Sequence, residues 1–272
     1  MTVYFDTSTW NHLEDHAKRE ELIHLIQQRK LRVVASVISV AEILRIQGDL
    51  RRRQICSTML ALHGDAPLLE RPFDLARAAA QGVLQGQVDF SIPRTGPGAY
   101  LLGCMLDVTQ TPPTGEIWNW LHNMDDNLAR LKAELNLLDL ASDLDVLPNV
   151  LGTEALLKML CKLPPAEELG VSPSQMRDIY GKSDVWKALG ATLAYMIRPS
   201  TTHAPNNKRG KKRPGAADLW QAPYLGAVGG FVTGDELMLD AISEISGAAT
   251  FRHPRSIEGS DSFFDRLPLV GK

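Results

Sequence analysis

Short apolar runs that stop at or just before an acidic residue constrain the fold of this chain more than any other feature. Val3–Phe5 stops at Asp6, and Phe231–Thr233 is separated from Asp235 by one glycine. Together with Leu31–Ala35, these runs predict buried strands of a parallel sheet. The carboxyl ends of parallel strands meet at one edge of the sheet, where ligands bind in α/β folds. The sequence therefore predicts a sheet edge that carries carboxylates.

Helical patterns between the predicted strands give the alternation of an α/β fold. Val40–Ile46 has the pattern of a helix, with Ser39 as its N-cap. After the last of the three strands we expect a helix over Asp235–Ile245 that ends at Gly247. Thr250–Arg252 is then expected to form a final strand. Strand and helix in alternation predict a parallel, doubly wound sheet.

Four acids occupy the ends of these elements, and together they predict a metal site. They are Asp6, Glu42, Asp218 and Asp235. Asp6 and Asp235 follow strands, whereas Glu42 and Asp218 lie near helix starts. Like-charged carboxylates that are gathered together repel each other unless they are protonated or bridged by a cation. Mg²⁺ and Mn²⁺ take hard oxygen ligands of this kind, so either ion fits the set.

Each acid also has a structural interpretation. Carboxylates favour helix N-termini, so Asp6, Asp218 and Asp235 are each candidates for N-caps. Glu42 stands three residues after Ser39, which is the place of the acid in a capping box. Taken singly, each acid favours capping. Taken together, with strands delivering two of them to one edge, they favour the metal site.

The order of the acids and their flanking residues resemble PIN-domain nucleases, a family of metal-dependent enzymes that cut RNA. The matching segments are VYFDTSTW at 3–10, SVISVAEIL at 36–44 and ADLWQAPYLGAVGGFVTGDELML at 217–239. The third is the most specific, because it joins a helix headed by an Asp, a small-residue turn, a strand and a further Asp. The resemblance implies a PIN-like α/β fold in which a parallel sheet is flanked by helices.

The middle of the chain is not matched by this resemblance. Compact PIN domains place the second and third acidic motifs much closer together than Glu42 and Asp218 lie here. The resemblance therefore implies a discontinuous nuclease core, residues 1–62 and 201–272. A mostly helical insertion, residues 63–200, would interrupt that core.

Two helices are expected in the insertion. From Glu116 to about Leu138, apolar residues recur at alternating steps of four and three, which is a heptad seam. An intramolecular helical bundle is the default interpretation of this seam, and a homodimer or protein contact is the alternative. Asp184–Ile197 is the second expected helix. Its inward-facing residues are predicted to be Val185, Trp186, Leu189, Leu193 and Met196.

The resemblance also assigns roles to the acids. Asp6 would be the central metal ligand, Asp218 and Asp235 would complete the inner sites, and Glu42 would hold a metal-bound water or act as a base. Phosphodiester hydrolysis needs a nucleophilic water, neutralisation of the negative charge around phosphorus and stabilisation of the leaving oxygen. One or two such ions supply all three. Thr7 and Ser8 could support the site by orienting a carboxylate or a water molecule. Asp240 is a third candidate for a supporting residue, but its position on the helix after Asp235 is expected to face solvent.

A basic segment, residues 206–214, precedes Asp218. Its charged residues are Lys208, Arg209, Lys211, Lys212 and Arg213. The whole chain has a formal net charge of −3, so RNA binding has to rely on a local patch such as this one. We expect the segment to bind the phosphate backbone of RNA, and a solvated loop is the alternative. Arg45 and Arg51–Arg53 would add a second basic margin, unless they form only an exposed helix face.

Composition narrows the setting of the protein. The chain has three scattered cysteines, Cys56, Cys104 and Cys161, which predict reduced thiols in a cytoplasmic protein and argue against a zinc site. The N-terminus shows no signal-peptide pattern. The apolar stretch 219–233 is too short to span a bilayer, so no membrane partner is expected.

Two other functions fit part of the pattern. A haloacid-dehalogenase-like phosphohydrolase would use Asp6 as nucleophile and Asp235 in a late acidic motif. However, Ser8 stands where such phosphatases have a second Asp, and Glu42 and Asp218 would have no role. A non-catalytic PIN-like module that binds RNA or protein is the other alternative. A toxin with an antitoxin-like partner, a housekeeping nuclease and a defence protein are all compatible with the sequence.

Overall fold

The computed structural model describes the two ends of the chain and part of its middle. The described residues are 2–28, 31–44, 46–63, 68–87, 151–197, 214 and 216–267. The expected heptad helix, Glu116 to Leu138, and the five charged residues of the basic segment lie outside them.

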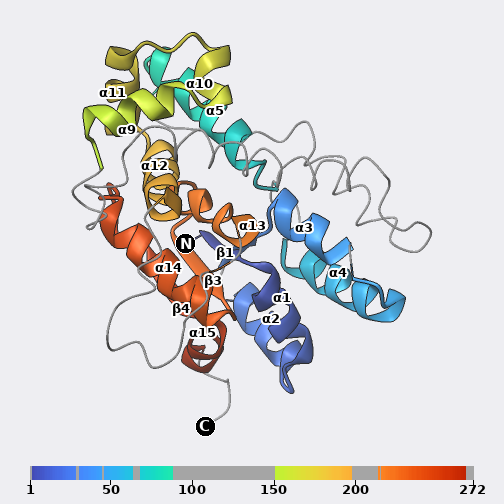
Figure 1. Ribbon diagram of the computed structural model, residues 1–272. Helices are drawn as coiled ribbons and strands as arrows, with labels where there is room; N and C mark the ends of the chain where they lie inside the picture. Colours follow the sequence, from blue (N-terminus) through green and yellow to red (C-terminus); the bar gives the residue numbers. More distant parts are fainter. Residues whose placement is uncertain are drawn as a thin grey trace.

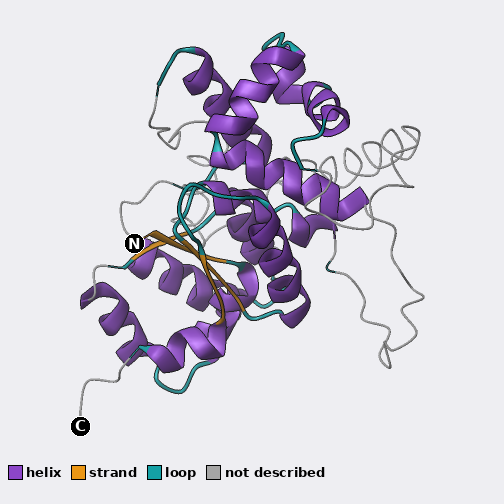
Figure 2. Ribbon diagram, turned by 90° about the vertical axis from the view of Figure 1, so that its left-hand side faces the viewer, coloured by secondary structure: helices purple, strands orange, loops and turns teal. Residues whose placement is uncertain are grey.

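A four-stranded sheet forms the centre of the described structure (Figures 1 and 2). Its strands are β1 (Thr2–Phe5), β2 (Arg32–Val34), β3 (Gly230–Thr233) and β4 (Ser256–Gly259). Their order is β2-β1-β3-β4, and all neighbours are parallel. The prediction of an α/β fold with a parallel sheet flanked by helices is therefore confirmed.

The central strand β1 joins the two ends of the chain. Val3 is in register with Val33 of β2, and Tyr4 is in register with Phe231 of β3. Val3, Tyr4 and Phe5 are all buried. This burial on both faces is what a continuous apolar run predicts for a strand inside a parallel sheet.

The sheet has its topological switch point between β1 and β3. The connection from β1 to β2 runs through α1 (Thr7–Asp15) and α2 (Arg19–Gln28), whereas α14 (Glu236–Ala248) leads from β3 to β4 on the other side. Because crossovers are right-handed, these connections cover opposite faces. Figure 1 shows α1 and α2 on one side of the strands and α14 on the other. In α/β folds, ligands bind at such a switch point.

Beyond β2, the chain forms two helices and then touches the sheet again. The helices are α3 (Val37–Leu44) and α4 (Asp49–His63). Leu69 then forms a parallel bridge with Ser36, and its backbone N–H donates to the carbonyl of Ala35 at 2.9 Å. The sheet edge is thereby extended by one residue past β2.

A second group of helices lies on one side of the molecule in both views (Figures 1 and 2). It contains α5 (Pro72–Leu84), α9 (Glu154–Cys161), α10 (Pro164–Glu168) and α11 (Pro173–Lys182). The expected helix Asp184–Ile197 is confirmed as α12, which packs against α5, against α14 and against the 3-10 helix η2 (Ala222–Gly226). Thus α12 connects this group to the sheet. Trp186 of α12 is fully buried, and its indole N–H donates to the carbonyl of Ala76 at 2.8 Å.

The N-terminus of α12 is tied to the chain around η2. Arg255 donates from Nη2 to Oδ2 of Asp184 and from Nε to the carbonyl of Leu225, both at 2.8 Å. Both charged side chains are about nine-tenths buried, so solvent screens this ion pair little. At Gly226, a Cβ atom would lie 2.3 Å from Cα of Val185. Only a glycine allows the two backbones to approach this closely.

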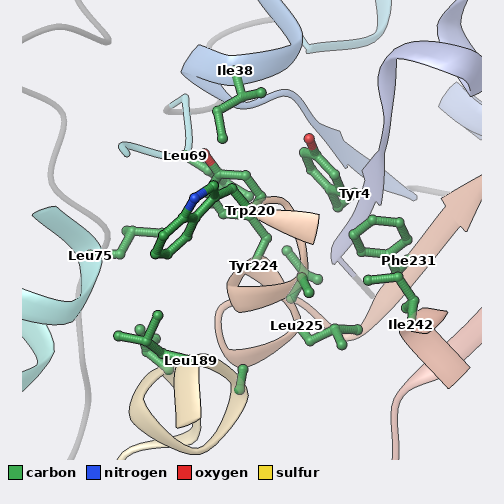
Figure 3. Close-up of a cluster of buried hydrophobic side chains, with 14 of the residues drawn as sticks. Tyr4, Ile38, Leu69, Leu75, Leu189, Trp220, Tyr224, Leu225, Phe231 and Ile242 are labelled. Carbon is green, nitrogen blue, oxygen red and sulfur yellow. The ribbon is translucent and has the colours of Figure 1, made fainter. Parts of the chain in front are cut away.

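Residues from all these elements form one continuous core. Figure 3 shows Tyr4 and Phe231 from the strands beside Tyr224 and Leu225 from η2, with Leu189 of α12 below them. Each of these five side chains is completely buried. None of the described helices is both long enough and apolar enough to cross a membrane.

The sequence placed the end of α14 and the last strand incorrectly. The helix continues through Gly247 to Ala248, because Ile245 and Ala248 are anchored in the core and this packing outweighs the low helix propensity of glycine. The chain leaves the helix at Thr250, whose φ of 45° is left-handed. The final strand is β4 at Ser256–Gly259 instead of Thr250–Arg252.

Gly226→Ala should destabilise the protein, because the added methyl group meets backbone atoms that cannot rotate away. We expect a loss of about 1–3 kcal/mol or more in the free energy of unfolding, as for other overpacked sites. Gly181→Ala is the matched control, since a Cβ atom there meets nothing within 4 Å. This change in α11 should be neutral or stabilise by up to about 1 kcal/mol. Urea unfolding of both variants measures the difference, and equal stabilities would contradict the close approach at Gly226.

Candidate active site at the carboxyl edge of the sheet

Asp6 lies at the switch point, directly after β1. Its backbone N–H donates to the carbonyl of Val232 in β3 at 3.2 Å, and its side chain is buried, with 5% exposed. One carboxylate oxygen, Oδ1, accepts from the backbone N–H and the hydroxyl of Thr9, both at 2.8 Å. The other, Oδ2, accepts from the hydroxyl of Thr233 at 2.6 Å. The hydroxyl of Ser8 lies 2.8 Å from both oxygens.

Burial governs the protonation of Asp6. It raises the pKa of this carboxyl above the ordinary value of 3.8, because the charged form loses its hydration. Hydrogen bonds from Thr233, Thr9 and Ser8 act in the opposite direction but leave the pKa raised. A cation placed beside Asp6 would therefore stabilise the charged form of its carboxylate.

Glu42 is hydrogen-bonded to Thr7, the residue that follows Asp6. It belongs to α3, is half-buried, and accepts a hydrogen bond at Oε2 from the hydroxyl of Thr7. Since Thr7 directly follows Asp6, this bond brings the second predicted acid to the same edge. The predicted supporting residues Thr7 and Ser8 thus each hydrogen-bond to a carboxylate.

The predicted capping box at Ser39 and Glu42 is wrong. The helix begins at Val37, so Ser39 lies inside it. Ser36 and Ser39 form the reciprocal pair: the N–H of Ser36 donates to Oγ of Ser39 at 3.0 Å, and the N–H of Ser39 donates to Oγ of Ser36 at 3.1 Å. The helix start thus has its own hydroxyl cap, and Glu42 takes no part in it.

Asp235 approaches Asp6 from β3. Its backbone N–H donates to Oγ1 of Thr233 at 3.1 Å, and the same Thr233 hydroxyl donates to Asp6. Asp235 is exposed and caps α14, because its Oδ1 accepts from the N–H groups of Leu237 and Met238 at 2.7 and 3.1 Å. Asp6 likewise caps α1, through Thr9. Both caps use Oδ1, so capping and a second role for Oδ2 are compatible.

Asp218 is linked to β1 through its backbone. It is the third residue of the short helix α13 (Ala216–Leu219), where the sequence predicted the head of a helix, and it is half-buried. Its carbonyl accepts from the N–H of Gln221 at 3.0 Å. The side chain of Gln221 in turn accepts from the hydroxyl of Tyr4 at 2.6 Å. Asp218 is therefore connected to β1 through two residues.

The sequence analysis gave no site role to three polar residues at this edge. Thr9 and Thr233 bind Asp6 directly, and the hydroxyl of Thr9 also lies 2.9 Å from the carbonyl of Val232. Glu70 follows Leu69, which extends the sheet past β2, and is buried with 2% exposed. The sequence signal for Thr233 was its place at a strand end, two residues before a predicted acid. Glu70 had no such signal, because its bridge is a single residue long.

The other predicted residues lie away from Asp6 or serve structural roles. Asp240 is exposed in the middle of α14. Arg51 forms a bidentate ion pair with Asp15, with N–O distances of 2.6 and 2.7 Å. Arg52 is buried and pairs with Asp49 at 2.6 Å. The predicted second basic margin is therefore wrong for the buried Arg52, and Arg51 is paired with Asp15. Arg45 lies outside the described residues, and Arg53 is exposed.

The donors around Asp6 fit a hard divalent cation by ligand type. Among the described residues, no three His, Cys, Asp or Glu side chains lie close enough together to hold a metal ion. However, among the residues that the structure describes, Oδ2 of Asp6 accepts from the hydroxyls of Ser8 and Thr233, which can rotate, whereas Oδ1 is held by a backbone N–H. Carboxylates and hydroxyls are ligands of the kind that Mg²⁺ and Mn²⁺ prefer.

Comparisons with protein-family models, with curated proteins and with solved structures found no match for this chain.

The raised pKa of Asp6 predicts how stability depends on pH. The folded protein holds the Asp6 proton more tightly than the unfolded chain, so this group's contribution is largest below the ordinary pKa of 3.8 and falls as pH rises through the raised value. In the presence of a chelator, the unfolding free energy of wild type minus that of Asp6→Asn should therefore decrease as the pH rises above the ordinary pKa of 3.8. Urea unfolding at several pH values measures this difference.

Thr233→Val supplies the matched variant for that measurement. It removes a hydrogen bond that lowers the pKa of Asp6, so the decrease with pH should extend to higher pH. A difference that is flat, or that increases with pH, would contradict a raised pKa at Asp6.

Proposed function

We propose that the protein is a metal-dependent endoribonuclease of the PIN type, which hydrolyses phosphodiester bonds of RNA with Mg²⁺ or Mn²⁺. The observation that supports this most is the linkage of three predicted acids at one point of the sheet. Thr7 connects the end of β1, at Asp6, to Glu42, and Thr233 connects Asp6 to Asp235. Their order along the chain is the order that resembles PIN-domain nucleases.

The residues would divide the work as follows. Asp6 and Asp235 would hold the metal, each through the oxygen that does not cap a helix. Asp218 of α13 is the third ligand that the resemblance implies, although among the described residues these side chains do not form a group of three that could hold a metal. Glu42, held by Thr7, would orient or deprotonate the attacking water. When bound, the ion neutralises negative charge on the phosphate and lowers the pKa of a coordinated water. Ser8 and Thr233 would fix the orientation of the Asp6 carboxylate.

The geometry favours a nuclease over the phosphohydrolase alternative. In that alternative, Asp6 would attack phosphorus and the residue at position 8 would transfer the proton. Ser8 instead donates to both Asp6 oxygens at 2.8 Å and accepts from the N–H of Gly234 at 2.7 Å. A serine hydroxyl bound in this way serves to orient Asp6 and is a poor proton donor at neutral pH.

RNA cleavage should require a divalent ion and should collapse in Asp6→Asn, because the amide cannot replace an anionic ligand. We expect a loss of at least about a hundredfold, the upper range for residues that support a metal site. Asp178→Asn is the matched control: it makes the same change at an exposed Asp of α11 and should keep full activity. The assay follows labelled single-stranded RNA with Mn²⁺ or with chelator.

Full cleavage by Asp6→Asn, or in excess chelator, would overturn the metal-site proposal. Release of phosphate from small monoesters, with the RNA left intact, would favour the phosphohydrolase.

The basic segment should act in binding more than in chemistry. Replacing Lys208, Arg209, Lys211, Lys212 and Arg213 with Ser should weaken RNA binding at low salt and leave turnover at saturating RNA unchanged. Each lost phosphate contact should reduce the slope of log affinity against log salt by about 0.7 for a single strand. Affinity measured over a salt series tests this, and an unaltered slope would mean that the segment is a solvated loop.

A further inference from the structure

The hydroxyl of Tyr4 lies at the meeting point of three elements under the candidate site. It donates to Oε1 of Gln221 at 2.6 Å and lies 2.9 Å from Oγ of Ser36 and 3.4 Å from Oγ of Ser39. All four residues are buried, with at most 3% exposed. Figure 3 shows the ring of Tyr4 beside Phe231, with its hydroxyl on the side of Ile38 in α3.

Each contact of this hydroxyl leads to a segment that carries one of the predicted acids. Tyr4 and Asp6 stand two residues apart in extended backbone, so their side chains point to the same face of the sheet. Ser36 caps the helix that carries Glu42. Gln221 closes the turn after Asp218, because its N–H donates to the carbonyl of Asp218.

The proton of Tyr4 goes to Gln221, so Tyr4 is left as an acceptor for the hydroxyl of Ser36. The hydroxyl of Ser39 lies 3.0 Å from Oγ of Ser36 and 3.3 Å from its carbonyl oxygen. The carbonyl oxygen of the Gln221 side chain can only accept, so the Tyr4 hydroxyl is the donor in that bond. Buried hydrogen-bond networks of this kind hold the segments that they join in fixed positions.

We propose that Tyr4, acting through Gln221 and Ser36, is a positioning residue that sets the spacing between the segments bearing Asp6, Glu42 and Asp218. The inference rests on the proposed function, because the spacing matters for a metal held by those acids. Residues that orient metal ligands in this way contribute about tenfold to a hundredfold to metal affinity.

The first test measures the Mn²⁺ affinity of the full chain by electron paramagnetic resonance of the free ion. Tyr4→Phe keeps the ring and removes only the hydroxyl, and we expect Mn²⁺ binding to weaken by about tenfold or more. Thr192→Val is the matched control: it removes a fully buried hydroxyl from α12, where that group donates only to the carbonyl of Ala188. Its affinity for Mn²⁺ should equal that of wild type. Equal affinities of Tyr4→Phe and Thr192→Val would overturn the proposal.

A double-mutant cycle tests whether the hydroxyl acts through Gln221. Gln221→Met conserves side-chain volume and removes the acceptor, so it should weaken Mn²⁺ binding as Tyr4→Phe does. If the two residues act as one link, the double variant should lose no more affinity than the more affected single variant. Additive losses would overturn the route through Gln221.

Backbone amide exchange, measured without metal, separates this inference from the proposed function. In Tyr4→Phe, amides of residues 216–222 and 36–44 should exchange faster, whereas those of α9 and α11 should keep their protection. Unchanged exchange in both segments would overturn the positioning role. If wild type itself fails to bind Mn²⁺, the metal-dependent nuclease is overturned, and the exchange data still decide whether Tyr4 holds these two segments.

Discussion

The burial of one carboxylate, that of Asp6, is the constraint on which the rest of the site depends. A buried carboxylate without donors is strongly unfavourable, so the fold has to supply hydrogen bonds from several directions. Thr9 supplies them from the first turn of α1 and Thr233 from the end of β3. Satisfying Asp6 therefore fixes the relative positions of two segments that are more than two hundred residues apart in sequence. The geometry at the switch point follows from that requirement.

A second constraint fixes the position of the helices that lie between the two halves of the sheet. The ion pair of Asp184 and Arg255 and the backbone contact at Gly226 hold α12 against η2, and η2 directly precedes β3. The packing of α12 against η2 therefore helps to fix the position of β3, which ends at Thr233 and leads to Asp235. The helical group and the candidate site are joined in one core, whichever residues bound the insertion that the sequence predicted.

The sequence predicted well those features that arise from local pattern. Continuous apolar runs identified β1, β2 and β3, and the helical stripe identified α12. What it missed depends on tertiary contacts. Packing carries α14 past Gly247, the single-residue bridge at Leu69 places Glu70 at the sheet edge, and a pair of serines replaces the expected capping box. The edge location of Asp6 followed from the alternation of strands and helices, whereas its hydroxyl donors became visible only when two distant segments met.

The parallel pairing of β1 with β3 has a consequence for how the protein is made. Val3 is in register with Gly230, so β1 has to wait during synthesis for a partner strand more than two hundred residues later in the chain. At typical synthesis rates this delay is roughly ten to fifty seconds. During that time β1 lacks its neighbour and Asp6 lacks Thr233, and long-range parallel pairing is itself slow to form. The hydrogen bond between Asp6 and Thr233 can therefore form only after the whole segment between these two residues has been synthesised.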